Sequence, residues 1–369
     1  MPVRLILLGS GVKSPRLMEA PATCRTSRLW EEIGRPRVAL APMVDQSELP
    51  FRILTRRHGA QLCTTPMFHA VNFLERAHRE RHGWAEVSRA LPASSRRSGV
   101  PILAHHIAPP EQTTHMATSR QGSTEGCAAD RPLLVQFAAN DPTAVLAASR
   151  HVSDRCDAVD LNLGCPQRIA KRGHYGAFLL EERELLSELV GTLHCHADVP
   201  VTCKIRLLDS LSETIDVARL LQAHGASLLA VHGRTKEQKG AHCGAADWAR
   251  VKAVADAVSI PVLANGGISS ADDTERCIAA TGADGVLIGE AALENPAIFE
   301  GGRVGDAQGA LAEEYLGIAE KQPTPLMGVK QHLFQMLYAG LQVTPIAEKT
   351  AEKIAGDAVI STVTRAGAS

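Results

Sequence analysis

The sequence has few aromatic residues, almost no net charge and no long apolar segment, and each absence excludes a class of protein. Aromatic residues make up 4% of the 369 residues, and the formal net charge is −1. A nucleic-acid-binding surface would have to be a local basic patch, because the chain as a whole is not basic. No apolar run approaches the roughly 20 residues of a membrane-spanning helix. We expect a soluble globular protein without membrane contact, whose core draws on the 45% of residues that are hydrophobic.

Paired-cysteine motifs are also lacking. None of the nine cysteines forms a C-x-x-C pair, the spacing typical of zinc sites and redox-active disulfides. An odd number of cysteines in a chain of this length favours reduced thiols in an intracellular protein. Three histidines, His105, His106 and His115, have no acidic or cysteine residue at ligand spacing. We therefore expect neither a disulfide framework nor a metal site.

Eight short apolar runs alternate with helix-like stretches from residue 38 onward. The runs are 38–41, 61–64, 132–137, 158–161, 199–205, 227–231, 260–264 and 284–288. From the third run on they follow one another at about 25 to 40 residues, which is the spacing of βα units in a parallel sheet. Eight such units predict an α/β fold, a closed (β/α)8 TIM barrel over residues 31–300.

Three segments fall outside this pattern. Residues 1–30 carry five cations against one acid, which fits either an organelle transit peptide or a disordered leader; we expect the leader, and a cytoplasmic protein. Residues 90–130 are rich in Ser, Thr, Pro, Gly and Gln without sustained periodicity, which predicts a surface insertion in the second βα unit. Residues 301–369 contain three helix-like stretches, 311–321, 325–341 and 346–359, which predict a small C-terminal helical domain.

The segment around Cys165 carries the strongest chemical signal. The buried run 158–161 is followed by Asn162-Leu163-Gly164-Cys165-Pro166, in which Gly164 permits a bend and Pro166 ends the strand. Cys165 therefore lies in a turn at the carboxyl end of a strand, where α/β proteins place their chemistry. A lone cysteine at such a position is more often a small buried packing residue. Position alone leaves both interpretations open.

Polar residues also occur on two neighbouring strands. Gln136 is an amide in the otherwise apolar third run, and its donor and acceptor suit a polar ligand. Lys204 and Arg206 lie on one face of the fifth run, because side chains alternate along a strand. Two cations at the end of a buried strand need an anionic partner. The alternatives are an anionic ligand and a carboxylate such as Asp160.

The last three predicted strands end in specific strings. The sixth run continues into His232-Gly233-Arg234-Thr235, and the next two end in Asn265-Gly266-Gly267 and Gly289-Glu290. Glycines after the last two strands of a barrel often cradle a phosphate, because bare backbone N–H groups can close on the anion. A strand-end histidine is more often structural, but here it is expected at the same mouth as Cys165.

Six strings taken together resemble the tRNA-dihydrouridine synthases, flavoenzymes that reduce uridine in tRNA. The strings are APMVDQSELPFR, TPMFHA, DLNLGCPQ, KRGHYGAFL, HGRTKEQKG and ANGGI. The version with HYGAFL resembles the eukaryotic subgroup that acts on uridines 16 and 17 of the D-loop. The resemblance covers residues 30–296 without the insertion and continues weakly over 328–334.

The resemblance implies a reaction and the residues that perform it. NADPH or NADH would reduce FMN, a hydride would pass from FMN to uracil C6, and Cys165 would donate a proton to C5. The implied catalytic residues are Cys165, Lys204 and His232. The implied substrate contacts are Asn162, Arg206 and Arg234. The implied FMN contacts are Pro42, Met43, Val44, Gln136, Lys204, His232, Asn265, Gly266, Gly267, Gly289 and Glu290. The partner would be tRNA, and we expect a monomer.

Two alternatives remain open at this point. A flavin barrel could instead reduce a free pyrimidine, although the helical C-terminal segment would then be needless. An inactive RNA-binding homologue would keep the fold without the chemistry. A flavin absorption band in the purified protein would exclude a role without flavin.

Overall fold

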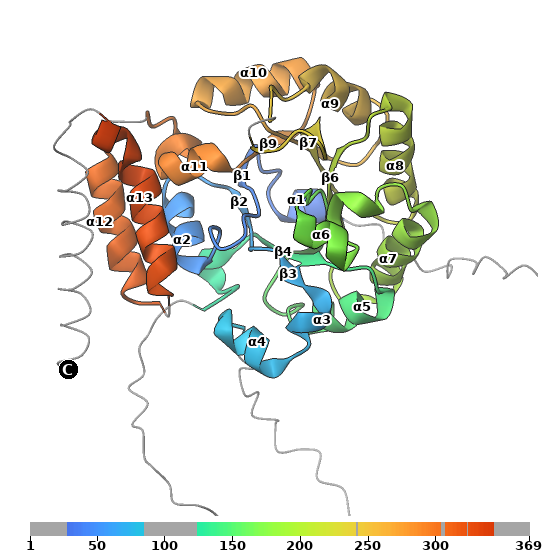
Figure 1. Ribbon diagram of the computed structural model, residues 1–369, viewed down its shortest axis with the longest axis horizontal. Helices are drawn as coiled ribbons and strands as arrows, with labels where there is room; N and C mark the ends of the chain where they lie inside the picture. Colours follow the sequence, from blue (N-terminus) through green and yellow to red (C-terminus); the bar gives the residue numbers. More distant parts are fainter. Residues whose placement is uncertain (1–27, 85–123, 241–242, 304–306, 323, 343–369) are drawn as a thin grey trace, which may run out of the picture.

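Eight parallel strands form a closed barrel in the computed structural model, which describes residues 28–84, 124–240, 243–303, 307–322 and 324–342 (Figure 1). The strands are β1 (Val38–Leu40), β2 (Leu62–Thr64), β4 (Leu133–Ala138), β5 (Ala158–Leu163), β6 (Val201–Leu207), β7 (Leu229–Thr235), β8 (Val262–Asn265) and β9 (Gly285–Ile288). β1 pairs with both β2 and β9, and β2 pairs with β4, which closes the ring. The predicted (β/α)8 fold is confirmed, and each of the eight apolar runs overlaps one strand of the barrel.

One further strand was not predicted. β3 (Phe68–His69) has two residues and pairs with Phe137 and Ala138 at the end of β4. A two-residue strand is too short to form an apolar run in the sequence. It extends the carboxyl end of the barrel between β4 and the short helix α3 (Ala70–Phe73).

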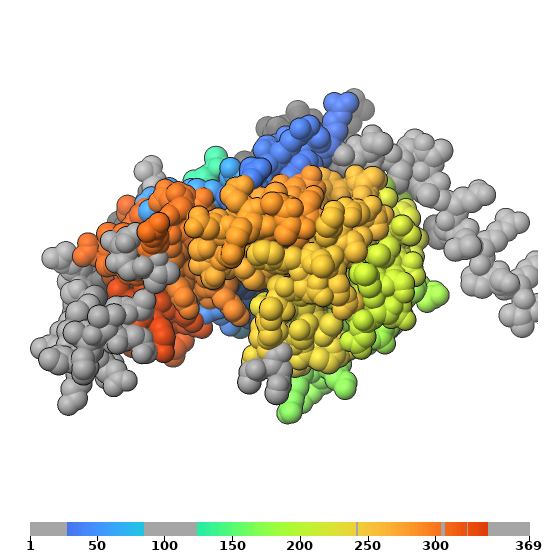
Figure 2. All heavy atoms as spheres, turned by 90° about the horizontal axis from the view of Figure 1, so that it is seen from above, coloured from blue at the N-terminus to red at the C-terminus, as the bar shows by residue number. Residues whose placement is uncertain are grey.

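Helices cover the outside of the barrel, and Figure 2 shows the wall formed by α9 and α10 beside the C-terminal helices. The longer helices are α2 (Leu49–Arg57), α5 (Pro142–Arg150), α7 (Arg183–His196), α8 (Leu211–Ala223), α9 (Trp248–Ala255) and α10 (Ala271–Thr281). The shorter ones are α4 (Arg76–Arg81), η1 (Ala128–Asp130), α6 (Arg168–Gly173), η2 (Gly176–Leu179), α11 (Glu290–Glu294) and η4 (Pro296–Glu300). Local sequence fixes several starts: the Asp141 side chain accepts from two backbone N–H groups of α5, whose first residue is Pro142.

A short helix closes the amino-terminal end of the barrel. Leu29 of α1 (Leu29–Glu32) and Ile33 belong to one buried cluster with Leu62, Leu134 and Ala158, which lie at or near the starts of their strands. This apolar plug fills the interior at that end. The carboxyl ends of the strands, where the candidate site residues follow, lie at the other end.

Two C-terminal helices pack beside the barrel on α2. α12 (Gln308–Ala319) contacts α2 and α13 (Leu326–Gln342), and α13 also contacts α11. The Tyr315 hydroxyl donates to Glu48 Oε1 at 2.9 Å, and His332 Nε2 lies 2.9 Å from Glu48 Oε2. The predicted C-terminal helical domain is therefore anchored to the first turn of α2. Its third predicted helix, 346–359, and the leader 1–27 lie outside the described residues.

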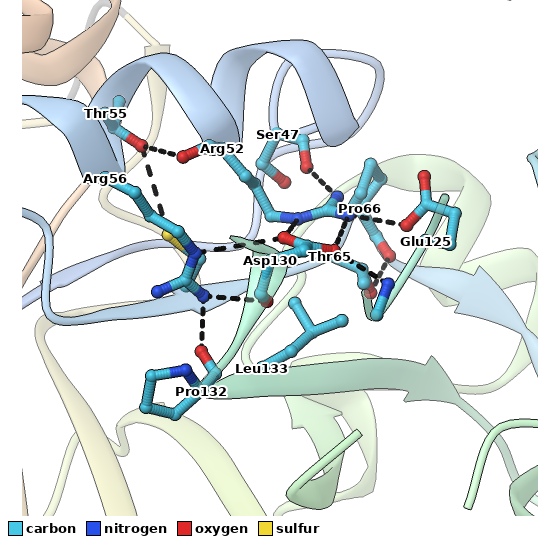
Figure 3. Close-up of polar contacts among 12 residues, drawn as sticks. Ser47, Arg52, Thr55, Arg56, Thr65, Pro66, Glu125, Asp130, Pro132 and Leu133 are labelled. Atoms are coloured by element: carbon cyan, nitrogen blue, oxygen red, sulfur yellow. Dashed lines mark hydrogen bonds and ion pairs between the residues drawn. The ribbon is translucent and has the colours of Figure 1, made fainter. Parts of the chain in front are cut away.

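The predicted insertion ends earlier than residue 130. Residues 85–123 are outside the described part, but Glu125 and Asp130 are buried against α2 (Figure 3). The fully buried Arg52 donates to both Asp130 oxygens at 2.9 and 2.7 Å, to Glu125 at 2.5 Å and to the Ser47 carbonyl at 2.7 Å. A buried guanidinium needs such carboxylates, because a charge removed from water without a partner is very costly. Residues 124–130 are therefore part of the barrel wall, which corrects the predicted boundary.

Three general properties complete the description. The eight cysteines within the described ranges are all free thiols. Among those same residues, no group of three or more His, Cys, Asp or Glu side chains could hold a metal ion. A search of the described helices finds none that is long and apolar enough to cross a membrane.

Candidate active site

The predicted site residues from successive strands meet at the carboxyl end of the barrel. The strand register places Asn162 of β5 beside Lys204 of β6, and Arg206 of β6 beside His232 of β7. His232 in turn lies beside Asn265, the last residue of β8. Residues 26 to 42 positions apart in the sequence are thus immediate neighbours at the mouth of the barrel.

Side-chain hydrogen bonds hold the turn that carries Cys165. Asn162 Oδ1 accepts from the backbone N–H groups of Gly164 (3.1 Å) and Cys165 (2.9 Å), and Arg206 Nε donates to the Gly164 carbonyl at 2.9 Å. Gly164 is not among the glycines with positive φ. The bend expected from a flexible glycine is therefore made by Asn162, which fixes the partly exposed Cys165 at the mouth.

The HYGAFL string packs directly against Cys165. Gly176 has φ +70°, and a Cβ at this position would lie 2.7 Å from the Cys165 carbonyl oxygen, so only glycine fits. The Ala177 N–H donates to the same carbonyl at 3.1 Å. Tyr175 belongs to the cluster that contacts Cys165, and burial together with the nearby Cys165 raises the pKa of the Tyr175 phenol. The sequence analysis assigned no role to this tyrosine, although it lies within a motif that was recognised.

A buried chain of polar side chains supports the floor of the site. Asp160 accepts from Thr202 Oγ1 at 2.6 Å and from Gln136 Nε2 at 2.8 Å, and Gln136 Oε1 accepts from Asn162 Nδ2 at 2.8 Å. The Gln136 amide retains one hydrogen and one lone pair for a ligand. Burial raises the pKa of Asp160. Asp160 and Thr202 were missed as site residues; the only signal was an acid inside an apolar run.

Lys204 is a partly buried cation that forms no ion pair or side-chain hydrogen bond in the described part of the chain. The alternative, a direct ion pair with Asp160, is not formed: Asp160 bonds to Gln136 and Thr202 instead and acts on Lys204 only through its charge. Burial, and then the neighbouring Arg206, lower the pKa of Lys204 to about 8. A desolvated ammonium group that has no carboxylate is suited to an anionic or electron-rich ligand.

His232 is a neutral side chain in this site. Arg234 Nη1 lies 3.1 Å from His232 Nε2, and since a guanidinium can only donate, Nε2 is the acceptor and the proton is on Nδ1. Burial first, and then Lys204, Arg206 and Arg234, lower the pKa of His232 to about 2. His232 can therefore donate a hydrogen bond from Nδ1, but it does not add another cation to the pocket.

The glycines after β8 leave backbone exposed at the mouth. A Cβ on Gly266 (φ +98°) would lie 2.8 Å from the His232 ring, and Gly267 has φ +78°. Trp248 Nε1 donates to the Gly266 carbonyl at 3.0 Å and braces this turn. Trp248 was another residue that the sequence analysis missed, because nothing in its local pattern points to the loop after β8. His232, Ala246 and Trp248 pack closely on this turn, so glycine is required there, and the phosphate cradle stays a prediction.

The loops after β1 and β9 lie side by side. A Cβ on Gly289 would approach Met43 Sδ to 3.6 Å, and the Met43 N–H donates to Ser47 Oγ at 3.0 Å. Val44 is 57% exposed, and Glu290 is the exposed first residue of α11. Pro42, Met43 and Val44 thus border the same end of the barrel as the glycine turns, and their FMN contacts stay predictions.

The chain matches the family model described as dihydrouridine synthase over residues 39–97 and 100–354. It belongs to the dihydrouridine synthase family. The resemblance inferred from the six strings is therefore confirmed.

Three relatives indicate where the chain falls within this family. A mouse protein named tRNA-dihydrouridine(16/17) synthase [NAD(P)(+)]-like is 46% identical over 312 residues, which are 84% of this chain and 57% of that protein. The tRNA-dihydrouridine(16/17) synthase [NAD(P)(+)] of Saccharomyces cerevisiae is 39% identical over 321 residues, 84% of this chain and 67% of that protein. A human tRNA-dihydrouridine(20a/20b) synthase [NAD(P)+]-like protein is 33% identical over 300 residues, 80% of each chain. This chain spans a little over half of the mouse protein's length.

Proposed function

We propose that the protein reduces uridine in tRNA to 5,6-dihydrouridine, using NADPH or NADH and FMN. The observation that carries this proposal is that the Cys165 thiol shares one barrel mouth with Lys204, a desolvated cation that forms no direct ion pair with a carboxylate of the described chain. Membership of the dihydrouridine synthase family supports the reaction class. The names of the mouse and yeast relatives support the substrate and the nicotinamide cofactor.

The residues present fit FMN in charge and in space. Lys204 offers an unpaired positive charge, Gln136 keeps one donor and one acceptor, and the glycine turns after β8 and β9 leave backbone free for a phosphate. When bound, FMN supplies the hydride that reduces the uracil ring. A neutral His232 contributes a donor without repelling the cations beside it.

Cys165 supplies the proton in this scheme. The Asn162 and Arg206 hydrogen bonds hold its turn in one conformation, so the thiol is positioned before substrate arrives. Proton donation to uracil C5 leaves a thiolate. Lys204 and Arg206 both interact electrostatically with Cys165, and their positive charges stabilise that thiolate.

Arg206 and Asn162 act in this proposal mainly as positioning residues. Arg206 donates to the carbonyls of Gly164, Thr235 and Gln238, which joins the loops after β5 and β7. Each keeps capacity for a contact with the base, as does Arg234. The finer assignments, uridines 16 and 17, a monomeric state and a cytoplasmic location, rest on the resemblance and remain part of the proposal.

A single-turnover experiment tests the proposed function. Purified protein should carry a flavin absorption band, and NADPH should bleach it. Unmodified tRNA should then restore the band and gain dihydrouridine, which mass mapping locates. Restoration by uracil or uridine monophosphate, but not by tRNA, would establish the free-pyrimidine alternative. A protein that binds no flavin would overturn the proposal altogether.

A further inference from the structure

The helix α6 carries an exposed surface to which the proposed chemistry assigns no role. The helix begins three residues after Cys165, and four of its five side chains are exposed. They are Arg168, Ile169, Lys171 and Arg172, and we call them the α6 surface. Ile169 leaves 67% of its surface accessible, which is unfavourable for a large aliphatic side chain unless something covers it.

The three cations of the α6 surface are not neutralised within the described part of the chain. The acids that follow in the sequence have other partners: Glu181 pairs with Lys236 at 2.7 Å, and Glu182 pairs with His174 at 2.5 Å. The surface therefore has a local excess of positive charge, although the whole chain has a net charge of −1. Such a patch attracts an anionic partner.

Contacts at both ends hold α6 over the barrel mouth. Lys239, from the loop after β7, donates to the Pro166 carbonyl just before the helix. Asn140, from the loop after β4, donates to the Gly173 carbonyl at the other end at 3.3 Å. Figure 1 shows α6 in front of the barrel opening, and Figure 2 shows the light green segment near residue 170 on the opposite side from the blue α1. A molecule that approaches Cys165 therefore passes α6.

We propose that the α6 surface binds the RNA strand that carries the reacting uridine. This inference rests on the proposed function, and it assigns the place where the strand lies outside the pocket. A uridine within a polymer can reach Cys165 only if the phosphates on either side of it stay at the mouth. Arg168, Lys171 and Arg172 contact those phosphates, and Ile169 packs against a neighbouring base or ribose. A free pyrimidine would have nothing to place there.

Salt dependence of binding tests this arrangement directly. Two triple variants that remove the same charge are compared as FMN-loaded proteins: R168Q/K171Q/R172Q on α6, and R37Q/R150Q/K252Q near the amino-terminal end of the barrel. Affinity for an unmodified tRNA transcript is measured between about 50 and 200 mM salt. Each lost phosphate contact lowers the slope of log K against log salt by about 0.7 to 0.9. The slope should fall by about 2 to 3 for the α6 variant and stay at the wild-type value for the control.

Ile169 is tested separately because it carries no charge. Ile169→Ala should weaken tRNA binding severalfold without a change in salt slope, and Ile169→Leu should keep wild-type affinity. FMN content and NADPH-driven bleaching should match wild type in every variant, because none of the atoms nearest to Gly266, Gly267 or Gly289 belongs to α6. Equal slopes of log K against log salt in the two triple variants would overturn the inference about α6. Reduction of tRNA by the wild-type protein would still support the proposed function in that case. Wild-type protein that loads FMN but neither binds nor reduces tRNA would instead refute the proposed function.

Discussion

Lys204 should make the FMN-free protein less stable, because its charge is kept desolvated for a ligand. The pKa of Lys204 falls from its ordinary value of 10.5 to about 8, and one pKa unit corresponds to about 1.4 kcal/mol. A pKa lower by about 2.5 corresponds to about 3 kcal/mol of destabilisation of the folded state. Because the side chain keeps some exposure, we expect a destabilisation of about 2 to 3 kcal/mol. Lys204→Met should therefore raise the free energy of unfolding of the FMN-free protein by this amount at pH 7.

The pH dependence of the free energy of unfolding tests independently whether Lys204 destabilises the folded protein. Below pH 8 the lysine is protonated in both the folded and the unfolded chain, so the destabilisation is complete and constant. Between pH 8 and 10.5 the unfolded chain binds more protons at this position, and wild-type stability rises with pH. The advantage of the Lys204→Met variant should therefore shrink across this window and vanish near pH 10.5.

Urea unfolding of FMN-free protein at several pH values measures this effect. Lys252→Met is the matched control, because Lys252 is exposed and paired only with Asp256 at the surface; its effect should stay within about 0.5 kcal/mol. Added FMN should stabilise wild type more than the Lys204→Met variant, because a ligand that binds the native state stabilises it according to its affinity. If the variant is less stable than wild type without FMN, Lys204 is a structural cation and its assignment to the cofactor is wrong.

Four further predictions follow from named contacts. Cys165→Ala should leave flavin reduction by NADPH at the wild-type rate and slow reoxidation by unmodified tRNA about 10²- to 10⁴-fold; reoxidation within about threefold of wild type would make the cysteine a packing residue. Gly266→Ala should lower FMN affinity in equilibrium dialysis, because its Cβ would lie 2.8 Å from the neighbouring histidine ring, and unchanged affinity would remove it from the cradle. Arg52→Met should lower the free energy of unfolding by about 3 to 5 kcal/mol in urea titrations, because it leaves the buried Glu125 without its ion-pair partner and Asp130 with only the more distant Arg56, at 3.9 Å; a loss below about 1 kcal/mol would contradict that account. Deleting 95–123 should preserve soluble, FMN-loaded protein, whereas deleting 95–126 should reduce its stability, and equal behaviour of the two deletions would show that the boundary is misplaced.

The barrel could be predicted from the sequence because parallel strands are buried on both faces and read as continuous apolar runs. β3 could not, because two residues give no periodicity. The end of the insertion was also misplaced, since Glu125 and Asp130 look like ordinary loop acids. Their burial depends on Arg52, which lies 73 and 78 positions earlier in the chain. The composition of the sequence around residues 124–130 does not predict such a contact.

In the candidate site, too, residues within recognisable strings could be predicted, and residues that depend on contacts with distant segments could not. Cys165 and His232 could be predicted as candidates because each lies in a string specific enough to be recognised, and their roles stay predictions. Trp248 and Tyr175 were missed because their roles arise from contacts with segments elsewhere in the chain. Trp248 acts through the Gly266 carbonyl, and Tyr175 through packing against Cys165. A sequence pattern names the groups that react more readily than the groups that hold them.

Helix α2 links the candidate site to the C-terminal helices. Just before its first turn, Ser47 bonds to Met43 in the loop predicted to contact FMN. The next residue, Glu48, accepts from Tyr315 of α12 and contacts His332 of α13. The start of α2 is therefore one of the points that fix the two C-terminal helices relative to the barrel mouth, together with the contact of α13 with α11. A free pyrimidine would not need a fixed surface beside the mouth. A folded substrate would, because it must be held while one nucleotide enters the pocket. This surface therefore favours tRNA over the small-molecule alternative.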